Sequence, residues 1–269
     1  MDFFDSHDWL NREGYNYSFK IDHIIFLVLA LLVAVGLCFL LYKKDKAFTK
    51  KVLTIIWIVS VALTIFYYGV QYVECIVNPN KYPFVMETML PLHSCLMFIY
   101  LFPFAIFSKN EIIRKAANNF IVVINMTIGF ITMFVGCPLL GYSTLSFAGI
   151  HSLLLHAIIF IVPLVMMVTG LYELQIKDIY YGLIAFAILA LTAWIFDAIT
   201  GCDYFYHYDG HTFPVFEFIS QNVHHLVWTL IVVSCYVITG VATHFLIVVS
   251  KYIKDKHQKK NSSEEPQIE

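Results

Sequence analysis

The stretch HIIFLVLALLVAVGLCFLLY, residues 23–42, decides the class of this protein, because it is an almost unbroken apolar run. A helix of about 20 residues crosses the roughly 30 Å of hydrocarbon in a bilayer. In lipid the backbone polar groups must bond to one another, so such a run has to be a helix. Lys43, Lys44 and Lys46 follow it directly. We therefore interpret the run as a membrane span with its basic flank inside the cell.

Further apolar runs of similar length repeat along the chain. They cover residues 52–73, 86–107, 118–136, 149–170, 179–200 and 223–250. Of the 269 residues 59% are hydrophobic and only 13% are charged, against roughly 25% charged in ordinary soluble domains. This composition excludes a soluble globular enzyme and a disordered protein, and the net charge of −2 argues against a nucleic-acid binder. The sequence predicts an all-α polytopic membrane protein, a bundle of seven transmembrane helices.

The basic residues predict the orientation of this bundle. Of the 17 lysines and arginines, 14 follow the first, third, fifth or seventh run, and only Arg12, Lys20 and Lys81 lie on the other side. The positive-inside rule then places the N-terminus outside and the C-terminus in the cytoplasm. We expect an extracellular tail over 1–22, a transmembrane domain over 23–250, and a basic, polar and disordered cytoplasmic tail over 251–269. The expected location is the cell membrane, of a bacterium.

Ionisable side chains inside membrane spans are costly, so each is a functional candidate. On the predicted topology most of them lie in the outer half of the membrane, which indicates a water-accessible cavity that opens outward. The alternative is that those near the boundary, Glu74, Glu87, His224 and His225, only contact lipid headgroups. The ionisable and polar residues of the outer half are Glu74, Glu87, His93, Cys95, His151, His156, Asp197, Glu217, Gln221, His224 and His225.

The segment Met89–Cys95, MLPLHSC, is the most informative of these sites. Pro91 removes a helix hydrogen bond and can kink the third span. Cys95 is a candidate nucleophile and His93 a candidate base. Residues two apart on a helix point in nearly opposite directions, however, so a histidine from another span is the better base for Cys95. We expect His156 to fill this role and read His151 as interfacial; the alternative for Cys95 is a packing residue.

Three further readings complete the candidate site. Asp197, near the outer end of the sixth span, is available to orient a histidine. The histidine and aspartate side chains at the outer end of the spans are of types that bind metals. No HxxxH or HExxH spacing supports a metal site, however, so neither a metal nor a cofactor is expected. A disulfide between two of Cys75, Cys137 and Cys202 stays open. Asn125 and Gly129 lie on a stripe of small residues that predicts close helix packing.

Three short motifs resemble those of the YwaF-type integral membrane family, which includes eukaryotic acyltransferase-like membrane proteins. They are Leu90–Cys95, Ser152–His156 and the aromatic stretch Cys202–Tyr206. The resemblance spans roughly residues 50–250 and implies a compact seven-helix domain. For the eukaryotic relatives it implies acyl transfer between phospholipids through a Cys and His pair. Their Cys directly precedes the His, whereas Leu92 stands there in this chain.

Three functions remain open at this point. The first is a lipid-modifying enzyme, an acyltransferase or ester hydrolase, with Cys95 as nucleophile, His156 or His93 as base and Asp197 as orienting acid. The second is a non-catalytic small-solute transporter or ligand-binding protein, and the third a structural partner in a membrane complex. The expected partners are membrane lipids and a lipid or small-molecule substrate, with no nucleic acid.

Overall fold

The computed structural model describes residues 19–80, 84, 92–136, 145–205 and 214–264, and within these ranges every regular element is a helix. The order is α1 (Ile21–Leu41), α2 (Lys46–Val77), η2 (Ser94–Leu96), α4 (Met97–Phe107), α5 (Glu111–Asn119), η3 (Phe120–Asn125), α6 (Met126–Ile131), η4 (Thr132–Gly136), α8 (Phe147–Val168), η5 (Ile176–Asp178), α9 (Ile179–Thr200), α10 (Pro214–Asn222) and α11 (His225–Glu264).

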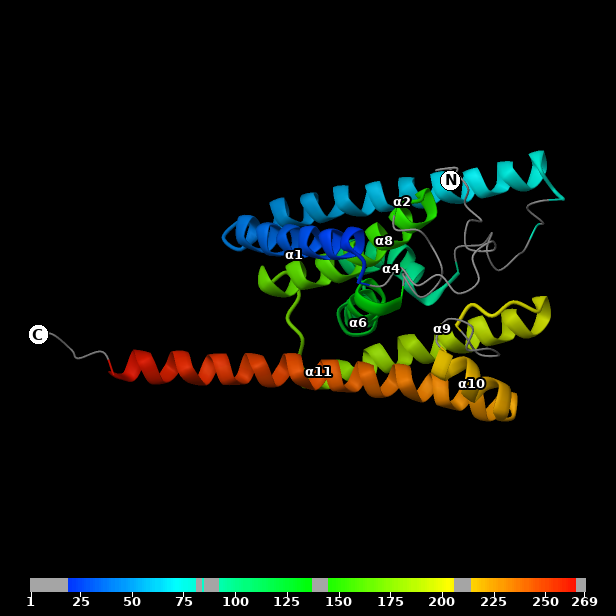
Figure 1. The fold of residues 1–269 in the computed structure, drawn as a ribbon. Helices are drawn as coiled ribbons and strands as arrows, with labels where there is room; N and C mark the ends of the chain where they lie inside the picture. The colour runs from blue at the N-terminus through cyan, green and yellow to red at the C-terminus, as the bar shows by residue number, and fades with distance from the viewer. Residues whose placement is uncertain (1–18, 81–83, 85–91, 137–144, 206–213, 265–269) are drawn as a thin grey trace, which may run out of the picture.

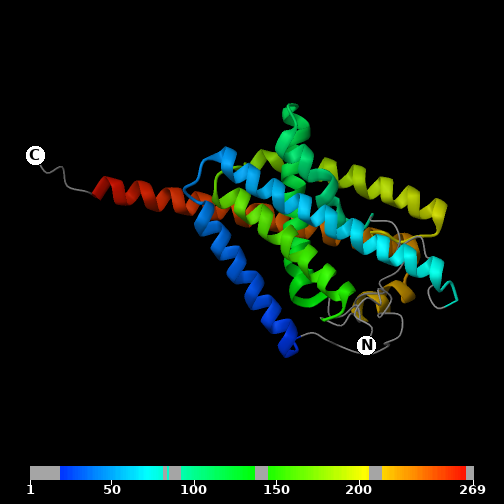
Figure 2. The ribbon, with the colours of Figure 1, turned by 90° about the horizontal axis from the view of Figure 1, so that it is seen from above.

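The helices form three layers around a buried centre. α1 and α2 lie on one side of α8, and α9 and α11 lie on the other side of the central segment α5–η3–α6 (Figure 1). α6 is seen nearly end-on in Figure 1 and this segment lengthwise in Figure 2, so it crosses α2, α8 and α11 steeply. The central segment and α8 are each 61% buried in their most apolar stretch, against 17–22% for the outer helices. The outer helices therefore present apolar surface to lipid.

Six of the described helices are long and apolar enough to cross a membrane. They cover Ile21–Leu41, Lys46–Val77, Glu111–Phe134, Phe147–Val168, Ile176–Thr200 and His225–Tyr252. The expected third span, 86–107, is represented among the described residues by the shorter apolar helix Ser94–Phe107. Its 14 residues extend about 21 Å, less than the bilayer core. Pro91 lies outside the described residues, and the extended backbone of His93 (φ −59°, ψ 151°) keeps the helix from beginning before Ser94.

Side-chain caps set where three of the helices begin. Asp45 accepts a hydrogen bond from the backbone N–H of Phe48 at the start of α2, and Asn110 does the same for two N–H groups at the start of α5. Ser146 caps α8 through the N–H of Gly149. These caps satisfy backbone donors that a helix start leaves open. The Asn110 cap explains why the fourth span begins seven residues earlier than the expected 118.

The central segment is irregular. η3 and η4 are π-helical, and π segments inside α-helices often occur at functional sites. At Gly129 an added Cβ would lie 2.7 Å from the Ile159 side chain and 2.8 Å from the carbonyl oxygen of His156. The α6 backbone thus packs directly on the α8 backbone, which confirms the packing role predicted for Gly129.

The helix α11 continues well past the membrane span, to Glu264, and projects beyond the other helices (Figure 2). The disordered tail expected from residue 251 onward is therefore wrong up to that point. The stretch 251–264 contains no glycine or proline and is rich in lysine. Lysine is a good helix former, so nothing in this stretch ends the helix that precedes it.

Candidate functional site

The turn that carries Cys95 is fixed by hydrogen bonds from two distant helices. The Ser94 hydroxyl lies 3.0 Å from the hydroxyl of Tyr236 on α11, and the Ser94 carbonyl accepts a hydrogen bond of 3.1 Å from Asn125 Nδ2 in η3. Asn125 is fully buried and Ser94 nearly so. Tertiary contacts therefore hold the first turn of this helix in place, directly beside the candidate nucleophile.

The Cys95 thiol is half-buried, reduced, and placed at a helix start. The backbone N–H of Leu96 donates to the carbonyl oxygen of His93 at 2.9 Å and so closes the first turn of this helix. The N-terminus of a helix stabilises a thiolate. The local geometry is therefore compatible with a nucleophile, although the residue also packs against the apolar core.

His156 lies in the middle of α8 with its tautomer fixed. Its Nδ1 lies 2.7 Å from the backbone carbonyl oxygen of Ser152. A carbonyl only accepts, so Nδ1 carries the proton and a neutral ring has an acceptor at Nε2. The ring is buried and interacts electrostatically with His93. The shared cavity predicted for the two histidines stays a prediction.

His93 and Asp197 meet at Tyr204, in the segment that follows α9. His93 Nδ1 donates a 3.3 Å hydrogen bond to the Tyr204 carbonyl, and its ring contacts the Tyr204 ring edge-on at 5.2 Å. The Asp197 carboxylate, which is 1% exposed, accepts the backbone N–H of Tyr204 at 3.2 Å. Asp197 contacts this backbone, so it positions the segment that orients His93.

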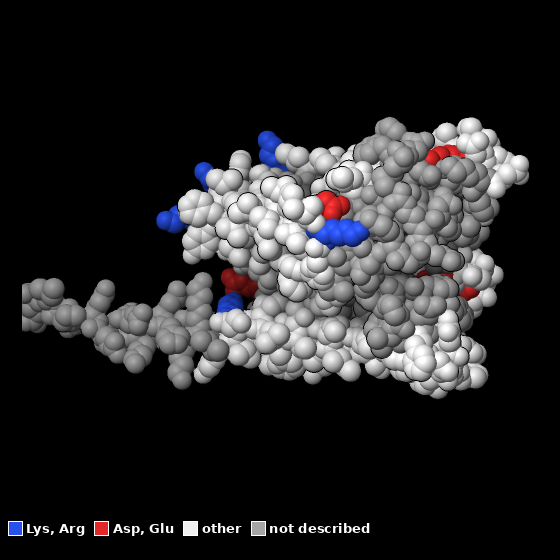
Figure 3. Space-filling model, viewed as in Figure 1, with Lys and Arg blue, Asp and Glu red and all other residues white. Residues whose placement is uncertain are grey.

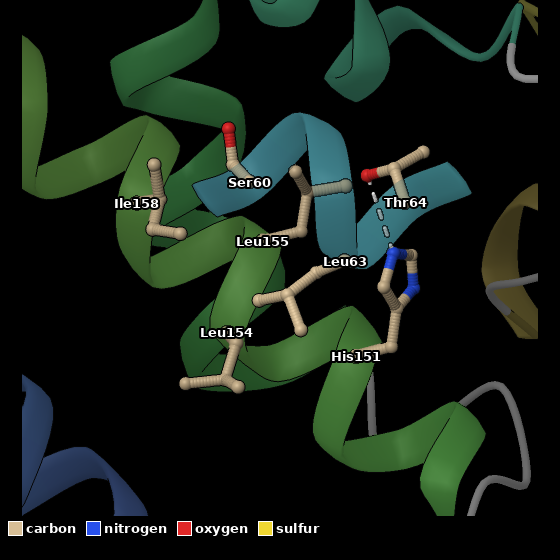
Figure 4. A pocket seen from close by; sticks show the side chains of 7 residues that line it. All are labelled: Ser60, Leu63, Thr64, His151, Leu154, Leu155 and Ile158. Atoms are coloured by element: carbon tan, nitrogen blue, oxygen red, sulfur yellow. Dashed lines mark hydrogen bonds between the residues drawn. The ribbon is translucent and has the colours of Figure 1, made fainter. Parts of the chain in front are cut away.

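His151 is buried between α2 and α8, and its predicted position at the membrane interface stays a prediction. Its ring stacks on Tyr67 at a centroid distance of 4.2 Å, and its Nε2 lies 3.4 Å from the Thr64 hydroxyl. A very small pocket of about 10 Å³ adjoins it, lined by Ser60, Leu63 and Thr64 from α2 and by His151, Leu154, Leu155 and Ile158 from α8 (Figure 4). The ring is buried because α2 presents polar and aromatic partners to it.

A polar stripe along α2 is a feature that the sequence interpretation missed. Ser60, Thr64, Tyr67 and Gln71 are all buried, and Gln71 donates a 2.9 Å hydrogen bond to the Tyr67 hydroxyl. They recur at intervals of three and four residues, the spacing of one helix face. This periodicity within an apolar run was the available signal. The contacts of Ser94 with Tyr236 and of His93 with Tyr204 left no comparable signal.

Over the described ranges, no three His, Cys, Asp or Glu side chains gather closely enough to hold a metal ion. Cys75 and Cys202 are reduced thiols, and Cys137 lies outside the described residues. Glu87 is also outside them, as is the side chain of Glu217.

Comparison with known proteins identifies the family. The model of the TMEM164 family matches residues 18–209, a range that includes His93, Cys95, His156 and Asp197. No curated protein and no solved structure matches the chain. The relation to the YwaF-type family and to its acyltransferases stays a prediction, as do a bacterial origin and the cell membrane as location. From its apolar helices and this match, the chain is a multi-pass integral membrane protein that belongs to the TMEM164 family.

Proposed function

We propose that this protein is a lipid-modifying enzyme that transfers or hydrolyses acyl groups through Cys95 and a histidine. The observation that carries the proposal is the arrangement at the start of the short apolar helix. There a thiol lies in the first turn of the helix, and His93, two residues before it, interacts electrostatically with the tautomer-fixed His156 of α8. A nucleophile and bases with defined tautomers are the parts that covalent acyl transfer requires.

The proposed reaction has two steps. In the first, His156 Nε2 takes the thiol proton as Cys95 Sγ attacks the ester carbonyl of a phospholipid, and the N-terminus of the helix stabilises the developing thiolate. The ester bond breaks, the lysolipid oxygen leaves with the proton from the histidine, and a thioester remains on Cys95. In the second step a hydroxyl of another lysolipid attacks the thioester for transfer, or water attacks it for hydrolysis, and the thiol is restored.

The supporting residues keep this arrangement in place in the proposed enzyme. Asn125 and Tyr236 hold the Ser94 turn, and Asp197 holds Tyr204, which orients His93. We propose a glycerophospholipid as the substrate class, because the outer helices expose mainly apolar side chains and so place the protein among lipids.

We also propose that the helix Ser94–Phe107 belongs to a seventh membrane crossing, with the N-terminus outside and the C-terminus in the cytoplasm. Seven is an odd number, which agrees with the one-sided distribution of basic residues along the sequence. On the face drawn in Figure 3, most lysines and arginines lie toward the end where α1 connects to α2, whereas acidic side chains lie at both ends and near the middle. Protease accessibility of tags at the two termini in sealed cells tests this, and two termini on one side would contradict it.

The enzymatic proposal is tested with purified protein in vesicles that contain a phospholipid with a labelled acyl chain. We expect Cys95→Ser to abolish transfer and His156→Ala to lower the rate about 10²- to 10⁴-fold, the usual contribution of a general base. Cys235→Ser is the matched control, because Cys235 is an exposed thiol. Mass spectrometry of the stalled wild-type protein should detect an acyl group on Cys95.

Two results would overturn the covalent route. If Cys95→Ser keeps full turnover while the histidine variants are inactive, water activated by histidine performs hydrolysis instead. If the wild-type protein turns over no ester and labels no thiol in any phospholipid vesicle, the enzymatic proposal fails and the binding or structural roles remain.

A further inference from the structure

Exposed lysines are concentrated where α1 ends and α2 begins. Two of them lie in the turn after α1 and three in the first turns of α2; they are Lys43, Lys44, Lys46, Lys50 and Lys51, and we call them the lysine patch. Asp45 is the one acidic residue among them in the sequence, so five lysines and one aspartate give the stretch 43–51 a net charge of +4. Figure 3 shows lysine and arginine side chains gathered at this end of the molecule.

Two lysines of other helices have carboxylate partners, whereas the lysines of the patch have none. Lys115 on α5 forms a 2.9 Å ion pair with Glu111, and Lys251 on α11 forms a 2.8 Å ion pair with Glu173. Within the part of the chain that the structure describes, no lysine of the patch forms such a pair. The patch is therefore a positively charged surface that the described chain does not neutralise.

The acidic groups near the patch are already engaged. The Asp45 carboxylate accepts the backbone N–H of Phe48 at 2.7 Å and so caps α2. Lys46 interacts electrostatically with Glu173, but that carboxylate is paired with Lys251. The patch also surrounds the N-terminus of α2, where the helix dipole is positive and a further positive charge is unfavourable. The repulsion among these charges is lowest when an anion from outside the chain lies among them.

The patch lies at the level of the lipid headgroups. The 21 residues of α1 extend about 31 Å, which matches the roughly 30 Å of the hydrocarbon core, so the turn after Leu41 falls at the membrane surface. Tyr42 in this turn is 55% exposed, and tyrosine is enriched at that level. Phe48, between the lysines of α2, is also exposed. An acidic protein segment would leave these rings without an apolar partner, whereas a lipid offers both an anionic group and an acyl chain.

We propose that the lysine patch binds the headgroup of an anionic phospholipid, with the acyl chains of that lipid against the exposed apolar side chains of α1 and α2. The backbone that carries the lysines is ordered, because the N–H of Lys44 donates to the carbonyl of Leu41 at 3.0 Å and the Asp45 cap fixes the start of α2. The bound lipid lowers the repulsion among the lysines and anchors this end of α1 and α2 at the membrane surface.

This lipid site is separate from the Cys95 site and does not depend on the proposed function. Lys46 of the patch and Lys251 of α11 both interact with Glu173. Tyr236, which contacts the Ser94 turn, lies on the same helix as Lys251 and about 22 Å from it. A lipid on the patch thus leaves the proposed catalytic site free, and its binding is measured without any assay of acyl transfer.

The test is native mass spectrometry of the full chain in detergent micelles, titrated with phosphatidylserine or with phosphatidylcholine. We expect the first phosphatidylserine to bind more tightly than the first phosphatidylcholine, and added salt to reduce this difference. Lys43→Gln/Lys44→Gln should weaken phosphatidylserine binding by about fivefold for each lysine and leave phosphatidylcholine binding unchanged. Both lysines are exposed and lie outside the helices, so the thermal unfolding midpoint in detergent alone should not change.

Lys115→Gln/Lys177→Gln is the matched control. It removes the same amount of charge, but Lys115 is paired with Glu111 and Lys177 also interacts with that carboxylate. We expect this variant to bind phosphatidylserine as the wild-type protein does. Equal weakening in the two double variants would show that net charge alone attracts the lipid and would overturn the proposal, as would equal affinity of the wild-type protein for the two lipids. Displacement of the bound phosphatidylserine by polyglutamate would also overturn it, because the partner would then be an acidic protein segment.

Discussion

Gly129→Ala tests how closely the two central helices pack. The new Cβ would lie 2.8 Å from the carbonyl oxygen of His156 and 3.0 Å from the backbone nitrogen of Phe160, where ordinary contacts begin at 3.4 Å. Both are backbone atoms of α8, so no side chain can move aside to relieve them. The helices α6 and α8 must therefore separate by about 0.6 Å, the shortfall at the carbonyl oxygen.

Overpacking of this kind costs roughly 1–3 kcal/mol, and the methyl group in a helix returns at most about 1 kcal/mol. We therefore expect a net loss of stability, measured as a lower midpoint of thermal unfolding in detergent micelles. Gly69→Ala is the matched control, because Gly69 is also helical and nothing lies within 4 Å of its added Cβ. That variant should be unchanged or slightly more stable.

The comparison between the two variants decides the matter. If Gly129→Ala unfolds at the same temperature as Gly69→Ala, or above it, then α6 and α8 are not in backbone contact. In that case the position of His156 next to the central segment is also wrong, since its carbonyl is one of the contacted atoms.

Three further predictions concern single hydrogen bonds and ion pairs. Asp197→Ala should lower the unfolding midpoint by the equivalent of about 1–3 kcal/mol, because it removes the acceptor of a buried N–H in segment 201–205. Asp197→Asn keeps an acceptor oxygen and should cost less, and equal losses in the two variants would contradict the hydrogen bond. Trp57→Phe removes the indole N–H that donates to a carbonyl of α4 at 2.9 Å and should cost about 0.5–1.5 kcal/mol in the same assay. Lys251 holds the pKa of Glu173 below its ordinary value through a 2.8 Å ion pair. The stabilisation by this ion pair is present above the pKa of Glu173 in the unfolded chain and is lost as the pH falls through its pKa in the folded protein. Because both groups are exposed, Glu173→Gln should lower the stability by less than about 1 kcal/mol. A larger loss at neutral pH would show that the pair is not exposed.

The candidate site was predictable from the sequence in its residue types but not in its contacts. His93, His156 and Asp197 stand out because ionisable groups are costly in apolar runs. Their positions depend on partners that lie far away in the chain, such as Tyr204 for both His93 and Asp197. The burial of Asp178, which ends η5 and is 1% exposed, could not be predicted from the sequence either, because this carboxylate follows a polar connection.

The sequence by itself determined the helices. The expected spans 23–42, 149–170 and 179–200 lie within three residues of α1, α8 and Ile176–Thr200. This is a local property, since in hydrocarbon every backbone group must bond within its own helix. Apolar side chains face both lipid and protein, so hydrophobicity does not reveal which face of a helix packs.

Only the tertiary structure decided what those helices bury and where the irregular parts begin. The helix at Ser94 starts where Asn125 and Tyr236 hold its first turn, although the apolar run starts near residue 86. His151 is buried because α2 supplies Tyr67 and Thr64 to its ring. Such contacts join residues many positions apart, and their energy exists only once the helices have packed.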